Sequence, residues 1–141
     1  MLHWKVSFDG PWSEIAEDRY RQGGFDGLSL VPSSAWVPSD LDFLYRLDGL
    51  RSFSLNAKVK NDIAAFKIPS LEHLSLVTGS RLRVPEEIQP LLLRLVMTDR
   101  PGVDVQTHWP ALESLRLGAW KGTDLQLLNG TLNLRHFRVE G

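Results

Sequence analysis

A leucine-rich pattern recurs along this chain about every 21 residues, and this repeat constrains the fold more than any other feature. The clearest copies read Leu-x-x-Leu-x-Leu, or the same with a final Met, and begin at Leu71, Leu92 and Leu112. Weaker copies begin at positions 25, 50 and 134, so four of the five intervals span 20 to 22 residues. A fixed period of this length predicts a solenoid, in which neighbouring repeats share one continuous core.

Each repeat changes its period, and the change predicts its local structure. The alternation x-Leu-x-Leu-x indicates a short strand with one apolar face. The next dozen residues, such as 63 to 69 and 84 to 91, carry apolar positions three or four apart and predict a helical or 3-10 return. Pro69, Pro90 and Pro110 stand at the same phase and end these returns before the next strand. The longest return, residues 31 to 47, is expected to contain a real helix.

The amino end predicts an atypical first unit, residues 1 to 24, that caps a single domain whose repeats run from 25 to 141. Residues 4 to 8 alternate as in a strand, and Gly23-Gly24 ends a helix expected from position 12 to 21. One face of that helix is expected to gather Trp12, Ile15, Ala16 and Tyr20.

These residues resemble the leucine-rich-repeat family over nearly the whole chain, as an irregular and small bacterial-type member. The resemblance rests on positions 71 to 76, 92 to 97 and 112 to 117, and on Val84-Pro85-x-x-Ile88-x-x-Leu91 in a return. It implies an α/β solenoid: a right-handed superhelix with a parallel sheet of about seven short strands on one face and short helical or 3-10 returns on the other, with ligands held on the concave sheet. The family's turn Asn is replaced here by Ser33, Lys58, Gly79, Arg100 and Trp120. We therefore expect the turn backbone groups to find other partners and the solenoid to be irregular.

Residues between the inward leucines must point outward, so the sequence also predicts the open face of the sheet. Its middle positions run from serine to arginine: Ser7, Ser29, Ser54, Ser75, Val96, Arg116 and Arg138. The candidate partner-binding residues are His73, Arg94, Arg116, Trp120, His136 and Arg138. Arginine's planar fork suits carboxylates, which favours an acidic loop or patch of another protein.

A plainer interpretation stays open for each of these residues. Outward charges maintain solubility, and Glu113 and Glu140 could balance the arginines within the chain. Trp120 could belong to the core, as we expect of Trp4, Trp36 and Trp109.

Composition excludes several classes of function. A net charge of −1 and a pI near 6.4 argue against nucleic-acid and membrane partners. The chain has no cysteine, and its four histidines are scattered, so neither a metal site nor a cofactor is expected. We expect no enzyme, although His73 with Ser52 or Ser54 allows a Ser-His pair on paper. With no secretory signal or long apolar run, the expected location is cytoplasmic.

The expected function is therefore protein binding without catalysis. A single-partner inhibitor, of the immunity or antitoxin type, fits the small size and uneven charge of the chain. The alternatives are a general adaptor or scaffold and a chaperone-like module that binds peptides. The carboxyl-terminal edge strand, residues 134 to 139, could also pair with a second copy to form a homodimer.

Overall fold

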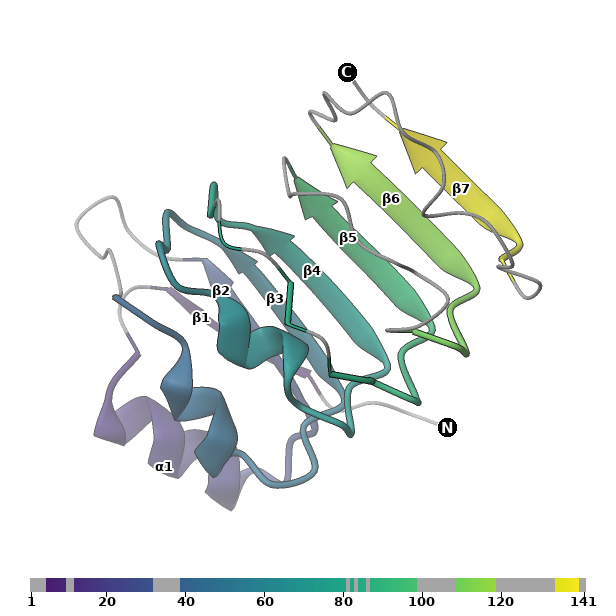
Figure 1. Ribbon diagram of the computed structural model, residues 1–141. Coiled ribbons are helices and arrows are strands. Elements are labelled where there is room, and N and C mark those ends of the chain that lie inside the picture. The colour runs from purple at the N-terminus through teal and green to yellow at the C-terminus, as the bar shows by residue number, and fades with distance from the viewer. Residues whose placement is uncertain are drawn as a thin grey trace.

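Parallel strands in sequence order form the body of the structure. The computed structural model describes residues 5–9, 12–31, 39–80, 82, 84, 85, 87–98, 109–118 and 134–139. Within them, one sheet has the order β1 (Lys5–Asp9), β2 (Gly27–Val31), β3 (Ser52–Asn56), β4 (His73–Val77), β5 (Arg94–Thr98), β6 (Ser114–Gly118) and β7 (His136–Val139). Figure 1 shows the strands side by side, with the helix and the 3-10 turns gathered on one side of the sheet. The expected α/β solenoid-like arrangement of about seven short strands is confirmed.

The two faces of the sheet divide as the alternation predicts. One inward row runs in register from Leu28 through Phe53, Leu74 and Leu95 to Leu115, and its side chains are at most 2% exposed. A second inward row, one strand period later, is buried to the same degree and comprises Leu30, Leu55, Leu76, Met97 and Leu117. Stacked repeats therefore bury one continuous core, which no repeat could form alone.

The repeated prolines sit in a recurring turn before β4, β5 and β6. The N–H groups of Leu71, Leu92 and Leu112 each donate to the carbonyl three residues earlier, at 3.3, 3.3 and 3.1 Å. Proline then occupies the second turn position, where its fixed φ is already suitable. The corresponding turn before β3 has Gly49 at φ 72°, a conformation that side chains with a Cβ rarely adopt.

The returns contain less helix than the sequence indicates. The return after β2 has a 3-10 helix, η1 (Asp42–Arg46), in place of the expected longer helix, and its residues 32–38 lie outside the described part. The return after β3 has the expected 3-10 turn, η2 (Ile63–Phe66). In the return after β4 the described residues form no helical turn, so the helical expectation for residues 84 to 91 is wrong there. A short extended segment or a 3-10 turn is long enough for a return, because each return only connects one strand to the next strand in the sheet.

After β1, the first unit continues with a helix that packs on the core. Helix α1 (Glu14–Gln22) begins after Ser13, whose hydroxyl accepts a hydrogen bond from the Ala16 N–H at 3.2 Å, and its C-cap is Gly23. Ala16 and Tyr20 are buried, but Ile15 is 70% exposed and does not join the inward face as predicted. The core contacts of α1 are instead made by Ala16 and Tyr20, which lie four residues apart and therefore on one face of the helix.

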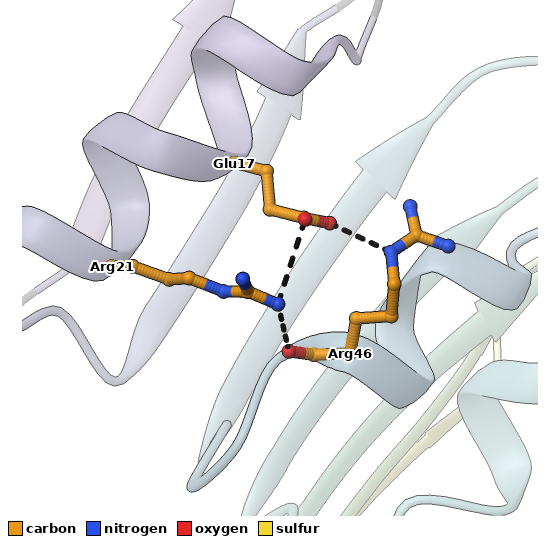
Figure 2. A network of polar contacts seen from close by, with 3 residues as sticks. All are labelled: Glu17, Arg21 and Arg46. Carbon is orange, nitrogen blue, oxygen red and sulfur yellow. Dashed lines mark hydrogen bonds and ion pairs between the residues drawn. The ribbon is translucent and has the colours of Figure 1, made fainter.

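A polar contact network attaches α1 to the next return. Glu17 accepts a hydrogen bond from Arg46 Nε at 3.0 Å and pairs with Arg21 at 3.5 Å. The Arg21 guanidinium also donates to the Arg46 carbonyl at 3.0 Å, which closes the network in Figure 2. Trp12 stacks on Phe43 with ring centroids 4.8 Å apart, so aromatic packing supports the same junction.

Backbone groups at the corner before each strand are paired between coils. The Asp26 carbonyl accepts from the N–H groups of Arg51 and Ser52, and the Arg51 carbonyl accepts from those of Glu72 and His73. The same double contact continues through the carbonyls of residues 72, 93 and 113 to β7. At this corner the Arg51 guanidinium lies between Asp26 and Glu72, and its hydrogen bond to Glu72 raises the pKa of Arg51. An unbroken series of backbone hydrogen bonds thus connects successive coils at this corner from β2 to β7.

Polar side chains replace the missing turn asparagines, as expected. Thr78 Oγ1 donates to the buried Asp62 carboxylate at 2.7 Å. Ser80 Oγ donates to the Lys60 carbonyl at 2.8 Å and accepts from the Leu82 N–H at 3.2 Å. The Thr78–Asp62 and Ser80–Lys60 contacts join consecutive coils at this turn.

Candidate functional site

The open face of the sheet has two complete rows of outward residues. The middle row runs in register through Ser7, Ser29, Ser54, Ser75, Val96, Arg116 and Arg138, in the order that the sequence predicts. The row before it runs through Lys5, Gly27, Ser52, His73, Arg94, Ser114 and His136. The middle row therefore changes from serine on β1–β4, through Val96 on β5, to arginine on β6 and β7.

Four basic side chains gather at the carboxyl-terminal end of this face, and we call them the basic patch: Arg94, Arg116, His136 and Arg138. All four are exposed. Arg116 and Arg138 are in-register partners on adjacent strands, about 4.8 Å apart in the backbone. Arg94 instead aligns with Ser114. The residue of β5 that aligns with Arg116 is Val96, two residues after Arg94. The spacing from Arg94 to Arg116 is therefore diagonal, roughly 8 Å.

The remaining candidate residues fall into different settings. His73 is half-buried and aligns with Arg94 on β5, so it borders the basic patch on its β4 side. Trp120 lies outside the described residues, and so do Trp4 and Trp36. Trp109 is 2% exposed, which confirms the expectation that it belongs to the core.

Charges near the basic patch include acids of this chain. Glu113 directly precedes β6 and is exposed at the corner, where its carbonyl accepts from the Arg135 and His136 N–H groups. The other expected acid, Glu140, lies outside the described residues. Arg116 and Arg138 both also interact with other groups of the chain.

The Ser-His pairing considered from the sequence is placed on one face. His73 on β4 is the in-register partner of Ser52 on β3, and Ser54 lies one outward position further along β3. The pair lies on the open sheet, and the carboxylate nearest in sequence, Glu72, pairs with Arg51 at the corner. Catalysis by such a pair requires an acid that orients the histidine.

The sequence did not indicate one exposed aromatic side chain at the carboxyl-terminal edge. Phe137 aligns with Leu115 in the inward row, yet it is 40% exposed whereas Leu115 is 1% exposed. Alternation predicts only the direction of a side chain, whereas exposure depends on what lies against it. The sole sequence signal was its position in the last strand.

Metal-binding clusters and membrane spans were both sought in the described part of the chain. No group of three or more histidine and acidic residues there is arranged to hold a metal ion. No helix in that part has the length and apolar character needed to cross a bilayer.

Comparison with protein-family models, with curated proteins and with solved structures found no match to this chain. The arrangement of the described residues is that of a seven-stranded parallel, solenoid-like sheet, consistent with a leucine-rich-repeat fold.

Proposed function

We propose that this chain is a protein-binding module of the leucine-rich-repeat type that has no catalytic role. Its basic patch, together with His73 and with Trp120, which follows β6 in the sequence, holds an acidic loop or patch of one protein partner. The partner is inhibited by this contact, as in an immunity or antitoxin protein, and the complex forms in the cytoplasm.

The observation that carries the proposal is the in-register clustering of the basic patch on the open face. Arg116 aligns with Arg138, and His136 lies one outward position before Arg138 on β7. Their side chains are exposed, so a carboxylate can approach without prior rearrangement of the sheet. Guanidinium groups bind carboxylates through paired hydrogen bonds, which favours an acidic protein surface as the ligand.

Arg116→Glu tests this proposal most directly. The tagged full chain is used to capture its partner from native lysate, and the affinity for the purified partner is then measured. We expect the substitution to weaken binding by roughly 30-fold or more, because it replaces attraction by repulsion in the centre of the contact.

Lys5→Glu is the matched control, since Lys5 is exposed on the same face at the opposite end of the sheet. This variant should change the affinity by less than about threefold, because the same charge change then lies far from the contact. Equal affinities for the Arg116→Glu, Arg94→Glu and unmodified chains would show that the partner uses another surface.

The same complex distinguishes an inhibitor from an adaptor. An inhibitor binds one partner with a Kd of about 1 nM or less and abolishes its activity. An adaptor or scaffold binds several partners weakly and leaves their activities intact.

A further inference from the structure

The outer edge of β7 differs from every other part of the sheet. Among the described strands, β7 pairs with β6 alone, and no strand pairs with its far side. Phe137 belongs to the inward row but remains 40% exposed, whereas its neighbours Leu115 and Leu95 in that row are 1% exposed. Figure 1 shows β7 at one end of the row of strands. The core thus presents an aromatic side chain at this edge.

Backbone geometry makes this edge able to accept a further strand. The His136 N–H donates to the Glu113 carbonyl at 3.0 Å, so residue 136 is bonded toward β6. In a parallel ladder the bonding direction alternates along the strand, which directs the N–H and C=O groups of Phe137 and Val139 away from β6. Such groups at an edge are a template for strand addition.

We propose that the partner adds an extended segment, with alternating acidic and apolar residues, as a further strand on β7. Its apolar side chains cover Phe137 on the inner face, and its acidic side chains face His136 and Arg138 on the outer face. The inference rests on the proposed function for the presence of an acidic partner, and it specifies how that partner is held. Main-chain hydrogen bonds then supply affinity, and the alternating side chains supply specificity.

The charge of Arg138 favours an acidic segment of a partner, rather than β7 of a second copy of the chain, as the strand added at this edge. Two antiparallel β7 strands keep their apolar faces together in a register that places Phe137 opposite its own copy. His136 then stands opposite Arg138 of the other copy. Shifting the register by one outward position places Arg138 opposite Arg138. The first register gives Arg138 no acid directly across from it, and the second places like charges opposite each other, which is destabilising, whereas an acidic segment gives Arg138 an attractive pair.

A synthetic peptide provides the probe. A capped peptide of about six residues, the length of a short strand, alternates glutamate and valine. The control peptide has the same composition with all glutamates before all valines. Titration of the labelled full chain, followed by nuclear magnetic resonance, should shift β7 resonances and protect the Phe137 and Val139 amides from exchange. The control should bind about tenfold more weakly or worse, because it cannot match both faces at once.

Edge variants test the backbone contact with matched controls. Val139→Pro removes an outward N–H and should weaken peptide binding about tenfold, whereas Val139→Thr retains the N–H and should bind as the unmodified chain does. Phe137→Ser should weaken binding and Phe137→Leu should restore it, because leucine again offers an apolar contact. Equal binding by the Pro and Thr variants would overturn the inference.

The two proposals fail in different ways. If Arg116→Glu abolishes binding of the native partner while Val139→Pro leaves it intact, the partner uses the open face only and the edge inference is wrong. If the alternating peptide binds at β7 but Arg116→Glu leaves the affinity for the native partner unchanged, the proposed function is wrong and the edge site is still supported. Self-association of the unliganded chain that is lost in Val139→Pro, measured by analytical ultracentrifugation, would assign the edge to a second copy and overturn the inference.

Discussion

Trp109 Nε1 donates a hydrogen bond to Gln89 Oε1 at 3.0 Å, and this contact joins two consecutive coils inside the solenoid. The amide nitrogen of Gln89 donates in turn to the carbonyls of Ala65 and Ile68, at 3.0 and 3.1 Å. Gln89 is 1% exposed and Trp109 is 2% exposed. One amide therefore links three successive coils: its own, the preceding one with Ala65 and Ile68, and the following one with Trp109.

Replacing Gln89 by methionine should lower the free energy of unfolding by about 2–4 kcal/mol. Methionine fills a similar volume but removes the hydrogen bonds to the Trp109 indole N–H and the Ala65 carbonyl, whereas the Ile68 carbonyl keeps the Leu71 N–H as a donor. Urea denaturation measures the change. Gln22→Met, at the exposed end of α1, is the matched control and should change stability by less than about 0.5 kcal/mol. A similar small loss for Gln89→Met would mean that the amide does not join the coils.

Thr78→Val should destabilise the turn region by about 1–3 kcal/mol, because the buried Asp62 carboxylate loses the hydroxyl that donates to it. Thr78→Ser retains a hydroxyl and should recover most of the loss. Thermal or urea unfolding of both variants measures the difference. Equal stability of the Val and Ser variants would contradict the assigned role of this hydroxyl.

Tyr20 should make stability fall at alkaline pH. Burial, with a smaller contribution from Asp26, raises the pKa of Tyr20 from 10.0 to about 12. Below pH 10 the phenol is protonated in both the folded and unfolded states, so its contribution is fully present. Between about pH 10 and 12 the unfolded state loses the proton before the folded state does, so the free energy of unfolding falls by roughly 2–3 kcal/mol at most.

Tyr20→Phe should remove that part of the alkaline loss. At neutral pH the variant should be as stable as the unmodified chain or more so, since the buried phenol has no hydrogen-bond partner among the described residues. Tyr45→Phe is the comparison, because burial also raises the pKa of Tyr45 but that side chain is 51% exposed. An alkaline profile that Tyr20→Phe leaves unchanged would show that other groups cause the loss.

The sheet could be predicted from the sequence almost residue by residue. The alternation within each repeat gives the direction of every strand side chain, and the 20- to 22-residue spacing aligns successive copies. The bounds of β3, for example, agree with outward Ser52, Ser54 and Asn56. The prolines likewise marked the turns, because their fixed φ suits one turn position only.

The helical content and the buried polar contacts could not be predicted in the same way. Residues 31 to 47 carry apolar positions at helical spacing, but the described part folds as the 3-10 helix η1. Gln89 and Asp62 do not belong to the repeated pattern, and their partners lie about one repeat length away in sequence. No local signal identifies such contacts, because they exist only once the coils are stacked.

The candidate site shows the same division. The sequence correctly placed Arg94, Arg116, His136 and Arg138 on one face. The sequence also aligned Arg116 with Arg138 in the middle row, and the register confirms this. Only the tertiary structure decided that inward-facing Phe137 remains exposed.

The sequence by itself determined the order of the strands and the face on which each strand residue lies, because both follow from periods written along the chain. Only the tertiary structure decided which buried polar groups meet and how far each side chain is covered. Those properties depend on atoms from neighbouring coils, which stacking brings together and which no segment carries alone.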